Sequence, residues 1–340
     1  MVAVTRTVES AEAMTRHDPP AKNDRPWGPQ RVVTPSAEPW AAEYPFASHW
    51  FGRDYGATGS AASPRAQGRV WMHYLDEGPH DAPVVVMLHG NPTWSFYWRS
   101  LIVALRDRYR CIVPDHLGMG LSDRPQEWPY TLASRIAHVR ALLANLGIKK
   151  FSLVVHDWGG AIGMGVATAN PGHIEKIVVT NTAAFLSQDI PLSIASVRIP
   201  VFGRVAVLRF NAFAGAATVR AVEKPLGKLA KAGLLAPYSN AHDRISTLKF
   251  VEDIPMKPSH PSWDTLKNIE DNLKSLSDKP MQLIWGDKDF CFTPKFRARW
   301  QEIFPNARVQ AYDDVGHYVM EDAPERANPL IRAFLDEGRA

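Results

Sequence analysis

Short apolar runs rich in β-branched residues alternate with stretches of helical periodicity along most of this 340-residue chain. The runs that predict strands are 49–53, 69–75, 84–88, 111–114, 151–155, 176–180, 281–285 and 308–312. Helical periodicity marks residues 131–146, 161–169, 294–304 and 324–335. Strands that are apolar without interruption are buried on both faces, so this order predicts an α/β fold with a doubly wound, mainly parallel sheet of eight strands.

The alternation stops between residues 185 and 275, where no convincing strand occurs and helices and prolines dominate. We interpret this segment as a helical cap inserted into a core formed by residues 44–184 and 276–340. Residues 1–43 are polar and proline-rich without apolar periodicity, which predicts a disordered tail. Residues 56–68 predict an elongated hairpin loop.

Composition excludes several classes of protein. With 39 Lys and Arg against 35 Asp and Glu, the formal charge of +4 is too small and too dispersed for a dedicated nucleic-acid binder. The only cysteines, Cys111 and Cys291, are too few for a disulfide framework. The amino terminus lacks the apolar core of a signal peptide, and we find no apolar stretch long enough to span a membrane. We therefore expect a cytoplasmic protein.

The turn after the strand at 151–155 predicts a nucleophile. This strand leads through His156 and Asp157 into a helix that begins with small residues, which is the context of a nucleophile elbow. The usual G-x-S-x-G pattern is changed at two positions, because Val155 replaces the first glycine and Asp157 occupies the place of the serine. Taken alone, Asp157 could equally be a helix N-cap.

Three other strand exits carry groups that complete a catalytic site. The turn His89-Gly90-Asn91 can present N–H donors above the elbow, as an oxyanion hole requires. Asp289 follows the strand at 281–285, and His317 follows the last strand. The order nucleophile, acid and histidine is that of α/β-hydrolases.

Five motifs resemble those of the haloalkane dehalogenase group of α/β-hydrolases: HGNPTWSFYWR (89–99), PDHLGMGLSDRP (114–125), VVHDWGG (154–160), WGDKDF (285–290) and VGHYVMEDAPE (315–325). The resemblance covers roughly residues 44–335. It implies that Asp157 is the nucleophile, His317 the general base and Asp289 the acid that orients it. It also implies that Asn91 and Trp158 bind the leaving anion or oxyanion. No cofactor is implied, and the histidines at separate strand exits do not form a metal-ligand pattern.

The residue types suit attack on an alkyl carbon. A carboxylate nucleophile leaves an ester, which a histidine-activated water can cleave, whereas a serine would leave a stable ether. Asp289 would hold the imidazole in one tautomer and stabilise its cation. Trp158 offers an indole N–H, which donates without accepting and so suits an anion.

Three activities of this superfamily compete. Epoxide hydrolases use two cap tyrosines, and Tyr238 is the only tyrosine between residues 185 and 279. Haloalkane dehalogenases fit all five site positions. The β-lactone decarboxylases of bacterial long-chain olefin biosynthesis keep the same five residues, and further segments resemble that branch: YLDEG (74–78), NTAAF (181–185), RISTLKFVEDIP (244–255) and DFCF (289–292). We therefore expect decarboxylation of a cis-3,4-dialkyl β-lactone to an alkene and CO2, with dehalogenation as the alternative. A non-catalytic binding protein of this fold is a further alternative.

The cap suggests two kinds of partner besides a hydrophobic small-molecule substrate. Residues 190–222 are mainly apolar, with Arg198, Arg204, Arg209 and Arg220 spaced among them. The simpler interpretation is a buried apolar face over the active site with solvated arginines. The alternative is that this basic lobe contacts a membrane surface or a partner enzyme, such as other enzymes of olefin biosynthesis.

Overall fold

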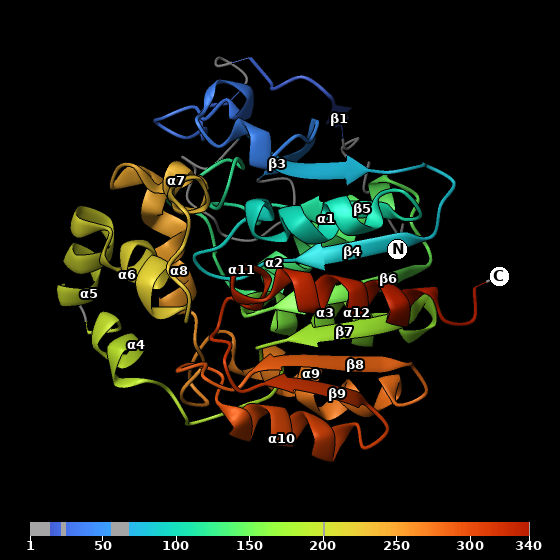
Figure 1. Cartoon of the computed structure of the whole chain (residues 1–340). Coiled ribbons are helices and arrows are strands. Elements are labelled where there is room, and N and C mark those ends of the chain that lie inside the picture. The colour runs from blue at the N-terminus through green and yellow to red at the C-terminus, as the bar shows by residue number, and fades with distance from the viewer. Residues whose placement is uncertain (1–13, 22–24, 56–67, 200, 340) are drawn as a thin grey trace, which may run out of the picture.

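The computed structural model describes residues 14–21, 25–55, 68–199 and 201–339. In this part of the chain the sheet has nine strands in the order β1-β2-β3-β5-β4-β6-β7-β8-β9 (Figure 1). Their bounds are β1 (Met14–Arg16), β2 (Ser48–Tyr55), β3 (Gly68–Glu77), β4 (Val84–Leu88), β5 (Arg110–Pro114), β6 (Phe151–His156), β7 (Ile174–Thr180), β8 (Met281–Gly286) and β9 (Arg308–Tyr312). The pairs from β5 to β9 are parallel, and the pairs that involve β1, β2 and β3 are antiparallel.

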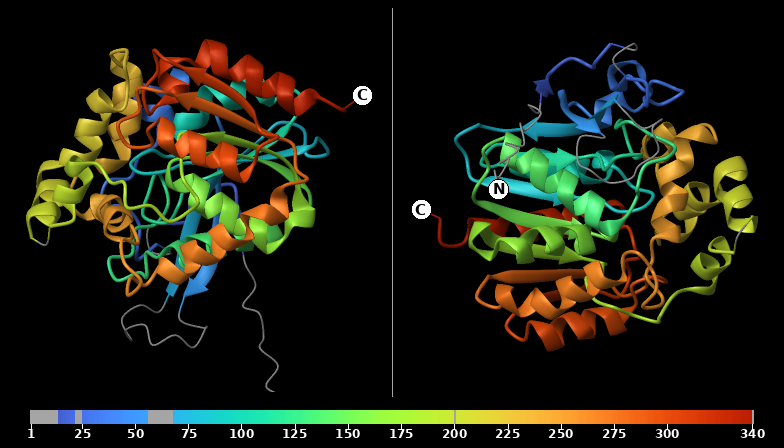
Figure 2. Two further views of the ribbon diagram at one scale, coloured as in Figure 1. Left: turned by 90° about the horizontal axis from the view of Figure 1, so that it is seen from below. Right: turned by 180° about the vertical axis from the view of Figure 1, so that it is seen from behind.

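Helices cover both faces of the sheet. On one face α1 (Arg99–Leu105) packs against α12 (Pro324–Asp336), next to the short α11 (Val319–Asp322). On the other face α3 (Trp158–Ala169) packs between α2 (Leu132–Asn145) and α9 (Trp263–Asn272), with α10 (Pro294–Ile303) beside them (Figure 2). The predicted doubly wound, mainly parallel architecture is confirmed.

The parallel strands are continuously apolar because each contributes to two separate cores. Along β4, Val86 and Leu88 belong to the cluster under α2, α3 and α9, whereas Val85 and Met87 belong to the cluster under α1 and α12. Successive side chains of a strand point to opposite faces, so a strand covered on both sides cannot alternate apolar with polar residues.

The inserted cap lies beyond the carboxyl ends of the parallel strands (Figures 1 and 2). It contains α4 (Leu192–Val197), α5 (Phe202–Arg204), α6 (Ala212–Arg220), α7 (Lys228–Leu235) and α8 (Ile245–Glu252). A π-helical turn, η6 (Val205–Arg209), joins α5 to the segment before α6. The predicted cap boundary at residue 275 is too late, because α9 packs against α3 and α2 of the core.

No helix within the described ranges has the length and apolar character needed to cross a bilayer.

The prediction of a disordered tail over residues 1–43 is wrong for residues 14–21 and 25–43. β1 pairs with β2, which makes the sheet one strand larger than the eight predicted. Trp40 is only 1% exposed and packs against Trp94 and Phe96. A few large aromatic side chains therefore anchor a segment whose average composition is polar. Residues 1–13, 22–24 and the predicted loop tip at 56–67 lie outside the described residues.

Candidate active site

Asp157 lies at the sharp turn between β6 and α3, at the centre of the sheet's carboxyl edge. Its backbone has φ +50° and ψ −129°, a conformation that non-glycine residues rarely adopt. Two glycines allow the neighbouring loops to approach this turn, because a Cβ on Gly90 would overlap the Asp157 carboxylate and one on Gly159 would overlap the Leu88 carbonyl. The strained turn and the close packing present the carboxylate towards the cap.

The Asp157 carboxylate is buried but hydrogen-bonded. The Asn91 backbone N–H donates to Oδ1 at 2.6 Å, and His317 Nε2 lies 3.7 Å from Oδ2. Burial raises the pKa of Asp157 above its ordinary value, while His317 and the amides of Asn91 and Trp158 oppose that rise. The site thus holds a poorly solvated carboxylate, which is a stronger nucleophile than a hydrated one.

His317 is oriented by a buried carboxylate. Its Nδ1 lies 2.7 Å from Asp289 Oδ2, and the same oxygen accepts a hydrogen bond from Asn181 Nδ2 at 2.9 Å. The other Asp289 oxygen accepts from the Cys291 N–H at 2.6 Å. Burial alone would lower the pKa of His317, but the charge and hydrogen bond of Asp289, together with Asp157, raise it. The imidazole is therefore held in one orientation between two carboxylates and retains its proton to a higher pH than a free histidine.

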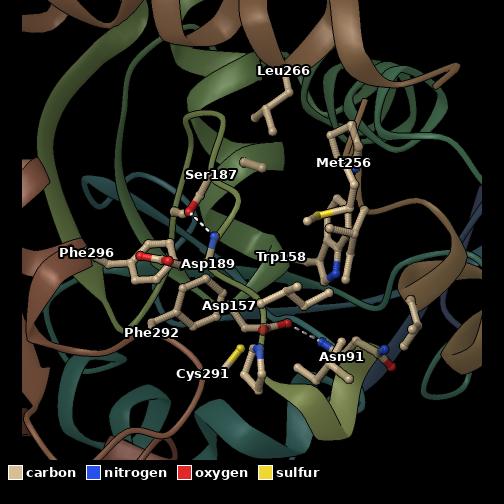
Figure 3. Close-up of a pocket in the computed structure, with 18 of the residues that line it drawn as sticks. Asn91, Asp157, Trp158, Ser187, Asp189, Met256, Leu266, Cys291, Phe292 and Phe296 are labelled. Carbon is tan, nitrogen blue, oxygen red and sulfur yellow. Dashed lines mark hydrogen bonds between the residues drawn. The ribbon is translucent and has the colours of Figure 1, made fainter. Parts of the chain in front are cut away.

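Asn91 and Trp158, the expected anion-binding pair, flank the carboxylate in different ways (Figure 3). The Asn91 side-chain Nδ2 donates to the Thr247 carbonyl of α8 at 3.0 Å, and its Oδ1 is buried with no hydrogen-bond partner in the described chain. The Trp158 indole lies tilted against Phe250, with the ring centroids 5.3 Å apart, and lines the cavity; its N–H donates to no acceptor among the described residues. The Asn91 Nδ2 could donate to an anion only after leaving the Thr247 carbonyl, whereas the Trp158 indole N–H can donate without losing a hydrogen bond.

Two apolar chambers meet at Asp157. The main chamber, about 840 Å³ and partly open to solvent, is lined by apolar side chains that include Phe185, Met256, Leu266, Phe292 and Phe296. The side chamber, about 670 Å³ and also partly open, is lined by His317, Tyr318, Phe290, Val197, Ala216 and Ala217. Both chambers share Asn91, Asp157, Ile194, Phe213 and Cys291. Asp157, the predicted nucleophile, therefore lies where the two chambers join.

The structure brings together Asp157, His317, Asp289, Asn91 and Trp158, which come from the exits of β4, β6, β8 and β9. The sequence analysis missed Asn181 and Tyr318. Asn181 follows β7. Its Nδ2 donates to the Gly286 carbonyl and its Oδ1 accepts from the Gly286 N–H, so this side chain fixes the loop that carries Asp289. Its position at a strand exit could have marked it as a site residue, but its partners, Gly286 and Asp289, become clear only from the pairing of β7 with β8.

The surroundings of Tyr238 and Cys291 fit a structural role rather than a catalytic one. The Tyr238 side chain is fully buried, lines neither chamber, and its hydroxyl lies 3.8 Å from Met119 Sδ, so it cannot protonate an epoxide at Asp157. Burial raises the pKa of the Cys291 thiol, which keeps it a neutral wall of the two chambers.

Comparisons with known proteins identify the family of this chain. The chain matches the family model of the alpha/beta hydrolase fold over residues 83–324. It is 45% identical over 278 residues to a cis-3-alkyl-4-alkyloxetan-2-one decarboxylase from Xanthomonas campestris pv. campestris, which covers 78% of this chain and 93% of that protein. A decarboxylase of the same name from Shewanella oneidensis is 42% identical over 273 residues, covering 78% of this chain and 85% of that protein. The crystal structure of an ancestral haloalkane dehalogenase matches with a TM-score of 0.74 and 27% identity, covering 79% of this chain and 96% of that one.

Proposed function

Because this chain belongs to the α/β-hydrolase fold family and shares 45% identity with a cis-3-alkyl-4-alkyloxetan-2-one decarboxylase, we propose that it converts a cis-3,4-dialkyl β-lactone into an alkene and CO2. The observation that carries this proposal is the position of Asp157 at the junction of two apolar chambers. Such a lactone has alkyl arms on two adjacent ring carbons, so each chamber can hold one arm while the ring lies on the carboxylate. A simple 1-haloalkane has a single arm and would leave one chamber without a ligand.

In the first step, the Asp157 carboxylate attacks C4, the ring carbon that is bonded to the ring oxygen. A bond forms between C4 and the Asp157 oxygen while the bond between C4 and the ring oxygen breaks, and its electron pair leaves as a carboxylate attached to C3. The Trp158 indole N–H is placed to donate to this carboxylate, as it would to a halide. The product is an ester of Asp157 that carries both arms.

In the second step, the bond between C3 and the carboxylate breaks and releases CO2. Its electron pair forms the double bond between C3 and C4, and the bond from C4 to Asp157 breaks, which restores the free carboxylate. No water and no net proton are consumed. Attack inverts C4 and an anti elimination follows, so a cis-lactone yields a cis-alkene.

His317 has an electrostatic role in this scheme. With its raised pKa and its Nε2 at 3.7 Å from Asp157 Oδ2, a protonated imidazole stabilises the carboxylate that reappears as the ester breaks. Asp289 holds the ring in place and compensates its charge. In a dehalogenase, by contrast, a neutral histidine must remove a proton from water.

Dehalogenation is the second candidate, and one observation favours it. The unpaired indole N–H of Trp158 beside a buried carboxylate would suit a departing halide as well as a carboxylate. Hydrolysis of the resulting ester would need a water between His317 and the Asp157 carbonyl carbon.

The experiment that separates the two offers a cis-dialkyl β-lactone and a 1-haloalkane to the purified protein in parallel, with alkene and free halide as the readouts. Asp157→Asn is the matched blank, because it keeps the shape of the side chain and removes the nucleophile. Alkene without halide supports the proposal. Halide without alkene contradicts it and assigns the site to dehalogenation.

The setting of this reaction is also part of the proposal. We place the protein in hydrocarbon biosynthesis in the cytoplasm, since the reaction releases an alkene and both cysteines are free thiols. An association with other enzymes of olefin formation is an expectation that co-purification from the native cell would test.

A further inference from the structure

The outer layer of the cap carries most of the exposed large apolar side chains of the described residues. Eight of ten such side chains lie in this one segment: Leu192, Ile199, Val201, Phe202, Val205, Phe210, Val219 and Leu229. Leu192 is 88% exposed, Val201 75% and Phe210 72%. They belong to α4–α7 and the turns between them, and α4–α6 are the parts of the cap farthest from the sheet (Figures 1 and 2). Single exposed apolar residues are ordinary, but a concentration of this kind marks an interaction surface.

The same segment is strongly basic. Residues 190–232 contain seven Lys and Arg and a single acid, Glu223, which gives this short stretch +6 in a chain whose total formal charge is +4. Arg204, Arg209, Lys228 and Lys231 are exposed, and none of them pairs with a carboxylate within the described ranges. Unpaired cations interleaved with exposed Leu, Val and Phe are typical of segments that lie in the interface of an anionic bilayer.

The inner side of these helices lines the active-site chambers. On α4, Leu192 is exposed whereas Ile194 lines both chambers. On α6, the exposed Ala216 and Arg220 also line the side chamber, so this chamber opens between the outer helices. The mouth of the side chamber is thus bordered by the apolar and basic surface.

We propose that the outer face of α4–α7 docks on an anionic lipid bilayer, with the mouth of the side chamber at the lipid surface. The charge selects this occupant, because the phosphates of an anionic bilayer complement the exposed Arg and Lys side chains of this face and its acyl region accepts the protruding Leu, Val and Phe side chains. Docking itself rests only on this surface. Its use, to transfer a dialkyl lactone from the bilayer to Asp157 without passage through water, rests on the proposed function.

Vesicle co-sedimentation of the full chain tests the docking. Vesicles of phosphatidylcholine alone are compared with vesicles of three parts phosphatidylcholine and one part phosphatidylglycerol, at low and high salt. We expect binding to the anionic vesicles that weakens as salt rises. Each basic residue near an anionic surface contributes to the free energy of membrane binding. The double variant Arg204→Glu with Arg209→Glu should therefore reduce the partition coefficient by about tenfold or more.

Matched variants separate this surface from a general effect of charge or hydrophobicity. Leu192→Ser, Phe202→Ser and Phe210→Ser together should abolish binding, while Val32→Ser with Val103→Ser, two exposed apolar residues outside the cap, should leave it unchanged. Lys149→Glu with Lys150→Glu is the control for charge, since both lysines are exposed on the core. Circular dichroism of each variant shows whether the fold is kept.

Three results would overturn the proposal. The first is that the protein does not bind anionic vesicles. The second is that the cap variants and the control variants lose binding equally. The third is that the protein binds no vesicles but forms a dimer, and that the cap variants dissociate this dimer. The last result would assign the face to a second copy of the chain. Activity provides the link to function: the triple Ser variant should keep its turnover of a short-chain lactone in solution and lose turnover of a long-chain lactone in vesicles. If the wild-type protein binds vesicles but forms no alkene from either lactone, the proposed function fails and the docking stands.

Discussion

At the scale of single residues, His317 distinguishes the two reactions that the site can support. Hydrolysis of an alkyl ester on Asp157 needs a general base, whereas decarboxylative elimination needs only charge stabilisation beside Oδ2, from which His317 Nε2 is 3.7 Å away. If the site dehalogenates, His317→Gln incubated with a 1-haloalkane should accumulate a protein ester, visible by intact mass as a gain of the alkyl group. With the β-lactone the same variant should keep turning over, roughly 10²-fold more slowly.

The control is His242→Gln, a cap histidine that lines neither chamber. Accumulation of an ester from the lactone as well would show that His317 also drives the second step and would contradict the assigned role.

The raised pKa values of Asp157 and His317 predict pH profiles that differ between the two reactions at high pH, where His317 loses its proton. Decarboxylation needs Asp157 ionised and His317 protonated, so kcat/KM should rise as Asp157 loses its proton and fall as pH passes the raised pKa of His317. If the site dehalogenates, halide release over many turnovers needs a neutral His317 to activate water, so its steady-state rate should keep increasing as His317 loses its proton. Rates of both reactions in a common buffer series would show this. In His317→Gln the fall of kcat/KM for the lactone at high pH should disappear. If this fall persists, a group other than His317 causes it.

Single-residue chemistry was also the part of the site most accessible from the sequence. The proximity of Asp157, Asp289 and His317 could be predicted because each lies in the turn or loop that follows a strand, and parallel strands end at one edge. Asn181 and the Thr247 carbonyl could not be predicted. Their contacts depend on the pairing of β7 with β8 and on how α8 lies over the core, which a local pattern does not encode.

At the scale of elements, α6 forms one wall of the side chamber and so limits the length of one alkyl arm. Ala217 is half-buried and lines only the side chamber. We predict that Ala217→Phe lowers kcat/KM by about tenfold or more for lactones with a long chain on one particular ring carbon, because a misfit in an apolar pocket has an effect of this size. Isomers with that arm shortened should be unaffected.

The measurement is a competition between two asymmetric lactones whose long and short arms are exchanged between C3 and C4. Ala232→Phe, on the exposed side of α7, is the matched control. Equal losses for both isomers would mean that the two chambers do not hold separate arms.

The elements of the core were more predictable than those of the cap. Each parallel strand is apolar without interruption because two layers of helices cover it, so its pattern follows from its burial. In the cap most residues of 190–222 are apolar, and which of them point inward, as Ile194 does, or outward, as Leu192 does, depends on packing that this composition cannot specify. β1 was missed because a three-residue strand has no measurable period.

At the scale of the whole molecule, the amino-terminal segment connects the core to the cap. The backbone N–H groups of Gln30 and Arg31 donate to the buried Asp243 of the cap, at 2.9 and 3.2 Å. Trp40 packs edge-on against Trp94, whose indole N–H donates to the Gly233 carbonyl of α7 at 3.0 Å. A segment that the sequence predicted to be disordered therefore stabilises the position of the cap over Asp157.

This arrangement predicts a large loss of stability from a change far from the chemistry. Trp40→Ala would leave a cavity among buried aromatic rings and should lower the free energy of unfolding by about 3 to 5 kcal/mol, measured by urea denaturation. Val32→Ala, at an exposed position in the same segment, should change it by less than about 0.5 kcal/mol. Similar small effects of both substitutions would contradict the packing of this segment. Trp40 contacts Trp94 in the turn that follows Asn91, and Trp94 in turn bonds the cap. Trp40→Ala should therefore also raise KM more for long-chain lactones than for lactones with short arms.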